Sequence, residues 1–183
     1  DQARRIAARL DKPSPEVLIE HHGVRLDPKR WARFWSAFVH VIRNAIDHGI
    51  EPGEERAAHG KPERGTIRLE TVVGAEGFVV SVEDDGRGVD WEKIAERAEK
   101  RDLPRASQAD LERALFADGV STAAQLTDIS GRGVGLGAVM SAVTELGGSV
   151  SVESEPGRGT TFRLVFPLDS RAPDLFRRLR DAA

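Results

Sequence analysis

The hydrophobic and polar positions predict one long helix in the first third of the chain. Pro28 suits its first turn, where no amide hydrogen is needed, and Gly49 ends it. At about 100° per residue, one broad face collects apolar side chains: Trp31, Phe34, Trp35, Phe38, Ile42 and Ala45. The opposite face is polar, with His40, Asn44 and Asp47 on it and Arg43 and His48 on its flanks. This polar face is the first candidate for chemistry.

Shorter patterns predict the remaining elements. Further helices are expected at residues 1–10, 91–100, 111–116 and 133–146, and a basic amphipathic helix at 172–182. Strands are expected at residues 16–20, 65–73, 78–84, 149–154 and 160–168, with turns at 74–77 and 155–159. Residues 101–132 carry weak, mixed signals and are predicted to form a mobile segment around one short helix. Because helices and antiparallel strands are grouped rather than alternating, the pattern predicts a two-layer α+β sandwich.

Composition narrows the class of protein. The chain has 183 residues, 39% of them apolar, which suits one domain with a sizeable core. A net charge of −3 argues against a nucleic-acid or anionic-membrane partner. There is no Cys, so disulfides and thiolate metal sites are excluded. No apolar run approaches the roughly 20 residues that cross a bilayer, so we expect a cytoplasmic protein. A start at Asp1 rather than Met suggests a piece of a longer protein.

The polar face of the long helix has two interpretations. It is either a solvated surface, as for most polar helix faces, or a ligand site. Five polar groups of fixed type sit beside one another there. The amide oxygen of Asn44 is a hard ligand of the kind that Mg²⁺ prefers. The clustering therefore favours a ligand site.

A second candidate follows the predicted strand at 78–84, where the chain reads Asp84-Asp85-Gly86-Arg87-Gly88. Asp and Gly are also the commonest turn residues, so the stretch could be an ordinary turn. A carboxylate at a strand end can accept a hydrogen bond from an adenine amino group. The glycines let the backbone approach the base closely.

Two glycine-rich stretches complete the set. The stretch 131–137 alternates glycines before a helix, which suits phosphate because backbone amides and the helix dipole point at the anion. It is not a Walker A loop, since no Lys-Ser/Thr follows, and it does not follow the first strand of a βαβ unit. The stretch 157–162 is a hairpin turn in which Thr160 could reinforce an adenine contact through water.

In this order, the four stretches resemble the GHKL ATPase superfamily (gyrase, Hsp90, histidine kinase, MutL). Within it, the chain is similar to the catalytic domain of CheA-type chemotaxis histidine kinases. The similarity is carried by the stretch 40–56 with Gly60-Lys61-Pro62, and by Ser121-Thr122 followed by the stretch 129–135. Other branches usually place Glu where this chain has His40. The resemblance covers about residues 10–168, nearly the whole chain.

The resemblance implies a Bergerat ATP-binding fold, in which helices pack on one face of a mixed, mainly antiparallel sheet. It implies that Asn44 binds Mg²⁺ between the phosphates, that His40 lies near the γ-phosphate, and that Asp84 reads adenine N6. The nucleotide-binding set that it implies is completed by Arg43, Asp47, His48, Gly86, Gly88, Lys93, Ser121, Thr122, Arg132, Gly133, Val134, Gly135, Leu136, Gly137 and Thr160. Residues 1–168 would form the catalytic domain, with an ATP lid at about 101–132, and residues 169–183 a C-terminal basic helix or linker.

The expected function is transfer of the γ-phosphate of ATP to a histidine on a separate phosphotransfer domain, because the chain has no phosphoacceptor stretch of its own. A response regulator would follow in the pathway. Dimerisation and receptor-coupling domains would lie outside the chain, so the isolated domain is expected to be monomeric.

The chain departs from the family pattern at Gly137, where CheA proteins commonly carry Asp, in a lid poor in Lys, and in the lack of a coupling β-domain after Leu168. One alternative is therefore a regulatory or structural module of a chemosensory array that binds nucleotide without transfer. Another is an ATPase that drives a clamp, but such an enzyme needs a Glu base where His40 stands.

Overall fold

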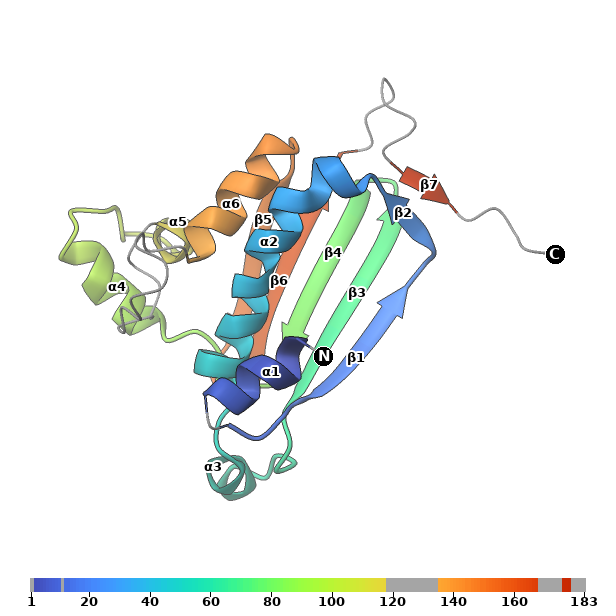
Figure 1. Cartoon of the computed structure of the whole chain (residues 1–183). Coiled ribbons are helices and arrows are strands. Elements are labelled where there is room, and N and C mark those ends of the chain that lie inside the picture. The colour runs from blue at the N-terminus through green and yellow to red at the C-terminus, as the bar shows by residue number, and fades with distance from the viewer. Residues whose placement is uncertain (1, 11, 118–134, 168–175, 179–183) are drawn as a thin grey trace.

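The computed structural model describes residues 2–10, 12–117, 135–167 and 176–178 of the chain (Figure 1). Its elements, in order, are α1 (Gln2–Arg9), β1 (Glu16–His21), β2 (Val24–Leu26), α2 (Pro28–Asn44), η1 (Ala45–Gly49), α3 (Gly53–Ala58), β3 (Thr66–Gly74), β4 (Gly77–Asp84), α4 (Trp91–Glu99), α5 (Gln108–Phe116), α6 (Leu136–Glu145), β5 (Ser149–Glu155), β6 (Gly159–Phe166) and β7 (Phe176–Arg178).

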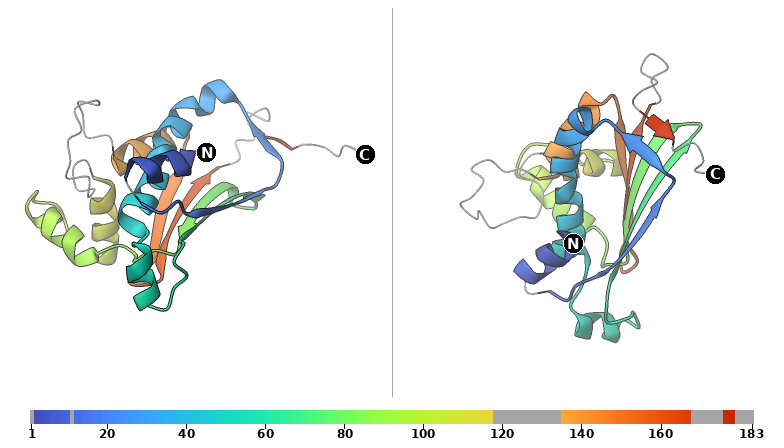
Figure 2. Two further views of the ribbon diagram at one scale, coloured as in Figure 1. Left: turned by 60° about the horizontal axis from the view of Figure 1, so that its bottom comes forward. Right: turned by 45° about the vertical axis from the view of Figure 1, so that its right-hand side comes forward.

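The main sheet has five strands in the order β1-β3-β4-β6-β5. Only the β1–β3 pair is parallel, and the other three pairs are antiparallel. Helices α2 and α6 pack together on one face of this sheet, and α3 lies at its lower end in Figure 1 (Figures 1 and 2). The expected two-layer sandwich with a mixed, mainly antiparallel sheet is confirmed. Each strand predicted for this sheet is present, within two residues at each described end.

Helix α2 forms where its sequence signals place it. The Asp27 carboxylate accepts hydrogen bonds from the amides of Lys29 and Arg30, over 2.8 and 3.1 Å, and Pro28 occupies the first turn. The buried Trp31 ring contacts Phe78 of β4 and Phe166 of β6, with ring centroids 5.5 and 4.6 Å apart. These aromatic contacts fix the helix across the centre of the sheet.

The predicted apolar face of α2 is wrong at one margin. Trp35 is 37% exposed and Ile42 is only half-buried, whereas Ala37 and Val41 are buried. The reason is the position of α6, which covers the side of α2 that carries Arg33 and, one turn later, Ala37. Arg33 forms an ion pair with Glu145 at the end of α6. The buried face is therefore rotated toward α6 and away from Trp35.

The expected C-terminal helix is also wrong over the three tail residues that the structure describes. Residues 176–178 form β7, which pairs antiparallel with β2, a strand that the sequence pattern did not predict. Pairing with β2 supplies backbone hydrogen bonds to this segment, so tertiary pairing overrides the helical pattern. The rest of the tail and the second part of the expected lid, residues 118–132, lie outside the described residues. The predicted short helix of the lid is present as α5, which a capping box between Ser107 and Asp110 begins.

Candidate nucleotide-binding site

A cavity of about 270 Å³ lies where the end of α2, the end of β4 and the start of α6 meet. Seven predicted site residues line it: Asn44, His48, Asp84, Gly88, Lys93, Leu136 and Thr160. Arg87, Val89, Asp90, Ile94, Leu115 and Phe162 also line it and were not singled out from the sequence. The polar helix face, the strand end and the start of the helix after the glycine-rich stretch therefore share one cleft.

The helix that carries Asn44 ends in a wider turn. From Ala45 to Gly49 the backbone forms a π-helix, closed by a 2.7 Å hydrogen bond from the Ile50 amide to the Ala45 carbonyl. Such turns are rare and occur frequently at functional sites. Asn44 directly precedes this turn and His48 lies within it, and both residues line the cavity.

Lys12 holds this helix end in place. Its ammonium group donates to the carbonyls of Ile46, over 2.9 Å, Ile50, over 3.2 Å, and Asp47. The last carbonyls of a helix lack intrahelical donors, and a cation at a helix C-terminus is favourable. Burial lowers the pKa of Lys12, although the Asp47 carboxylate opposes the shift. Sequence reasoning missed Lys12, because its partners lie 34 to 38 residues further along the chain.

Asp84 is a buried carboxyl group at the inner end of the cavity. It is the last residue of β4, it lies opposite Thr160 of β6, and it is only 4% exposed. The Gly86 amide donates to Asp84 Oδ1 over 3.0 Å. Burial raises the pKa of Asp84 to about 7; the Gly86 amide opposes the shift. Gly49 makes room for this carboxyl group, since a Cβ atom there would lie 2.9 Å from Oδ1.

The turn after Asp84 is attached to the hairpin between β5 and β6. The Val89 amide donates to Ser154 Oγ over 2.8 Å, and Ser154 Oγ donates to the Gly159 carbonyl over 2.9 Å. Gly88 has a φ of +81°, and a Cβ atom there would lie 2.6 Å from the Glu155 carbonyl oxygen. The glycine is therefore needed for the close approach of the turn to the hairpin. Ser154 was missed from the sequence, where a serine in a strand carries no distinguishing signal.

The other predicted residues of the helix end surround the cavity without lining it. His40 lies one turn before Asn44 and is half-buried, and burial is the main reason that its pKa is lowered, with Arg43 adding to the effect. Arg43 is exposed. The Asp47 carboxylate lies 3.7 Å from Nε2 of His48. Burial also lowers the pKa of His48, and Asp47 opposes this shift.

The remaining predicted residues are placed as follows. Lys93, in the first turn of α4, forms a 2.6 Å ion pair with Asp90. Gly135 directly precedes α6, whereas Gly137 lines a separate depression beside Phe116. Gly86 belongs to the turn but does not line the cavity. Five predicted residues lie outside the described part of the chain: Ser121, Thr122, Arg132, Gly133 and Val134.

Residues 16–170 match the family model of histidine kinase-, DNA gyrase B- and HSP90-like ATPases. The chain belongs to this family. The match covers the cavity and every strand of the main sheet. It supports ATP as the nucleotide, and it makes the chain an ATP-binding domain of this family.

Curated relatives confirm the resemblance to CheA-type kinases. The chain is 38% identical over 174 residues to the chemotaxis protein CheA of Halobacterium salinarum, covering 90% of this chain and 25% of that protein. It is 45% identical over 136 residues to CheA of Bacillus subtilis, covering 71% of this chain and 20% of that protein. The gliding motility regulatory protein of Myxococcus xanthus is 37% identical over 172 residues, which are 91% of this chain and 22% of that protein. The chain therefore spans about a quarter of the length of these relatives or less.

Solved structures show the same fold. The mycobacterial sensor histidine kinase MprB superposes with a TM-score of 0.55 at 17% identity, covering 91% of this chain and 90% of that chain. The blue-light activated histidine kinase of Erythrobacter litoralis EL346 gives a TM-score of 0.55 at 20% identity, covering 94% of this chain and 41% of that chain.

Every helix that the structure describes is too short or too polar to span a bilayer.

Proposed function

We propose that this chain is the catalytic domain of a CheA-type histidine kinase, which binds Mg-ATP and transfers its γ-phosphate to a histidine on a separate phosphotransfer domain. One observation carries the proposal. The cavity has a buried acceptor, Asp84, at one wall, and an amide, Asn44, and a helix start, Leu136, at others. An adenine base needs a hydrogen-bond acceptor such as Asp84. A metal-bound triphosphate needs a metal ligand such as the Asn44 amide and a helix N-terminus such as the one at Leu136.

Asp84 suits the adenine end of the nucleotide. Its carboxyl group can accept a hydrogen bond from the exocyclic amino group of adenine, whereas guanine carries a carbonyl oxygen at that position. The Thr160 hydroxyl lies 3.2 Å from Ser154 Oγ at the same wall, where it can support a bridging water. Because a buried polar group rejects a ligand that leaves it unpaired, the site favours ATP over GTP.

The phosphate end would lie between Asn44, His48 and the start of α6. The N-terminus of a helix carries about half a positive charge and free amides, which favour phosphate. Lys93, which also lines the cavity, adds a cation. His40, one turn before Asn44, would lie near the γ-phosphate, with Arg43, Asp47 and the glycine-rich stretch around it.

Asn44 is the residue that would hold Mg²⁺. In the described part of the chain, no group of three or more His, Asp or Glu side chains could hold a metal ion. This fits magnesium, which is commonly held by one or two protein ligands together with substrate phosphates and waters. When bound, the metal neutralises charge on the phosphates during transfer. The chain itself orients the nucleotide and excludes water from the base.

The acceptor would come from outside this chain. His21, His22 and His59 are exposed, while the half-buried His40 and His48 belong to the proposed nucleotide site. The CheA relatives are about four times longer than the matched part, which leaves room for acceptor, dimerisation and coupling domains. We expect the isolated domain to be monomeric and cytoplasmic, with a response regulator as the further partner.

Two measurements test the proposal. Titration of the chain with ATP and with GTP, each with Mg²⁺, is expected to show a clear preference for ATP. Incubation with [γ-³²P]ATP and a CheA phosphotransfer domain is expected to label that domain on histidine, and not the chain alone. Rapid labelling of the isolated chain on histidine would contradict the separate acceptor. ATP binding without any transfer would instead favour the regulatory module without transfer activity.

A further inference from the structure

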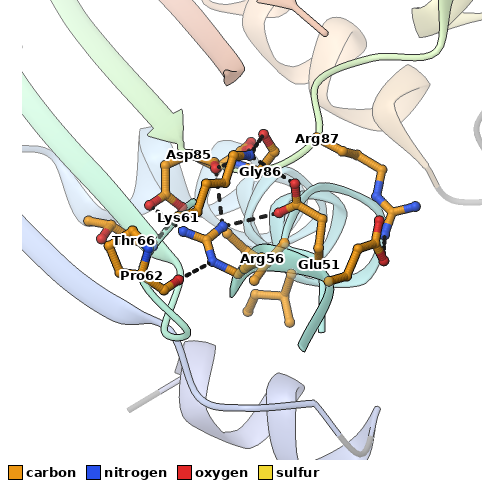
Figure 3. A network of polar contacts seen from close by, with 12 residues as sticks. Glu51, Arg56, Lys61, Pro62, Thr66, Asp85, Gly86 and Arg87 are labelled. Carbon is orange, nitrogen blue, oxygen red and sulfur yellow. Dashed lines mark hydrogen bonds and ion pairs between the residues drawn. The ribbon is translucent and has the colours of Figure 1, made fainter. Parts of the chain in front are cut away.

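Four charged residues, two of them buried and two half-buried, form a cluster under the turn that follows β4 (Figure 3). We call Glu51, Arg56, Lys61 and Asp85 the four-charge cluster. Glu51 is 3% exposed and Arg56 is fully buried. None of the four lines the cavity. The proposed catalytic site therefore does not account for them.

Arg56, on α3, uses its whole guanidinium group in this cluster. It donates to Glu51 over 3.0 Å, to the Asp85 carboxylate over 2.8 Å and to the Asp85 carbonyl over 3.1 Å. Its Nε donates to the Pro62 carbonyl over 2.7 Å. The planar guanidinium group has fixed donor directions, so it holds its partners in one geometry. Arg56 therefore ties α3 to the turn.

Lys61 completes the arrangement from the loop after α3. Its ammonium group donates to Glu51 over 2.8 Å and to the carbonyls of Asp85 and Gly86 over 2.9 and 2.8 Å. All three ammonium donors thus have acceptors. Burial by itself would raise the pKa of Glu51, but the hydrogen bond from Lys61 and the nearby cations lower it below its ordinary value.

The contacts converge on the backbone next to Asp84. The Asp85 carbonyl accepts from both cations, and the Asp85 carboxylate also accepts from the Thr66 amide over 2.8 Å. The Gly86 amide donates in turn to Asp84 Oδ1. The backbone that orients the Asp84 carboxyl group is therefore held on the side away from the cavity by this cluster.

A role in stability alone explains the cluster poorly. Buried ion pairs are expensive to desolvate, and apolar residues of similar volume often stabilise a fold as well or better. Charged groups joined by paired hydrogen bonds also fix the direction in which their partners are held. We propose that Arg56 and Lys61 are positioning residues, which hold the Asp84 carboxyl group in the orientation that selects adenine. This inference rests on the proposed function, in which Asp84 reads the base.

Lys61→Met is the variant that tests the inference. It keeps the length of the side chain and removes the three hydrogen bonds, and Lys61 is 16% exposed, so water can replace part of what is lost. Lys29→Met is the matched control, because Lys29 is exposed and lies about 22 Å along α2 from Asn44. The measurements are the dissociation constants of ATP and GTP, by competition against a fluorescent ATP analogue, and the urea midpoint of unfolding.

We expect Lys61→Met to weaken ATP binding about tenfold and GTP binding by less than about threefold, so that the preference for ATP collapses. Lys29→Met is expected to leave both constants unchanged. Unchanged selectivity in Lys61→Met would overturn the inference. So would equal losses for ATP and GTP together with a lower urea midpoint, because that result indicates a structural role only.

Glu51→Gln provides a second test should Lys61→Met fail to fold. It keeps the shape of the side chain and removes the charge that holds Lys61, so selectivity is expected to fall in the same direction by a smaller factor. The wild-type titration separates the two proposals. A wild-type chain without any preference for ATP refutes the proposed function, whereas a selective wild-type chain with an equally selective Lys61→Met refutes only the positioning role.

Discussion

Burial of Asp84 makes the stability of this chain depend on pH in an unusual direction. Most carboxyl groups in folded proteins have lowered pKa values and stabilise the fold as the pH rises. The pKa of Asp84 is instead raised by burial, from 3.8 to about 7. The folded chain therefore binds this proton more tightly than the unfolded chain does. The stability due to this proton is fully present below pH 3.8 and is lost as the pH rises to about 7.

The size of the stability change follows from the difference between the pKa values of Asp84 in the folded and unfolded chains. A difference of about three pKa units, at about 1.4 kcal/mol each, is on the order of 4 kcal/mol in the free energy of unfolding. The side chain is only 4% exposed, so solvent screens the effect little. Asp84→Asn removes the titrating group and keeps an oxygen that can accept from the Gly86 amide. The variant is therefore expected to gain stability relative to wild type by about this amount between pH 4 and pH 8.

The assay is urea unfolding of the nucleotide-free wild-type chain and of Asp84→Asn at intervals of one pH unit from 4 to 8. Glu83→Gln is the control, because Glu83 is exposed on the same strand and the substitution likewise replaces a carboxyl group by an amide. Subtracting the change in the free energy of unfolding caused by Glu83→Gln from that caused by Asp84→Asn, at each pH, leaves the contribution of the buried Asp84 carboxyl group. A difference between Asp84→Asn and wild type that stays constant over this range would refute the reasoning.

Three further predictions concern the end of α2. Asn44→Asp places a carboxylate against the triphosphate, so phosphotransfer measured with [γ-³²P]ATP is expected to fall by about 10²–10³ with an unchanged circular dichroism spectrum; transfer near the wild-type rate would exclude Asn44 from the site. Gly49→Ala places a methyl group 2.9 Å from Asp84 Oδ1, so calorimetry is expected to show roughly tenfold weaker ATP binding; unchanged affinity would mean that Asp84 does not contact the nucleotide. Lys12→Met removes three donors to carbonyls, so the free energy of unfolding in urea is expected to fall by about 1–3 kcal/mol; a difference near zero would show that water serves these carbonyls equally well.

Local patterns were sufficient for most of the elements. Helix α2 begins at Pro28, as the preference of proline for a first turn indicates, and the hairpins β3–β4 and β5–β6 turn where glycine occurs. These signals act over a few residues, so they can be recognised without the fold. The order of the polar and glycine-rich stretches also identified the family, which the comparison confirmed.

Side-chain burial depended on the neighbours of each element. The period of α2 shows that one face is apolar, but only the position of α6 decides that Ala37 is buried and Trp35 exposed. Similarly, residues 176–178 form a strand because β2, at least 150 residues earlier, is their partner. Such choices are made by packing and pairing over long sequence separations, which override local propensity.

The chemistry of the site divides in the same way. The sequence alone determined which groups were available, since Asn44, His48 and Asp84 could be singled out by residue type and spacing. Only the tertiary structure decided that Lys12 caps the helix end, that Arg56 reaches Asp85 over 29 residues, and that Asp84 is buried deeply enough to raise its pKa. The physical reason is that hydrogen bonds and desolvation depend on distances in space, which residue spacing along the chain does not specify.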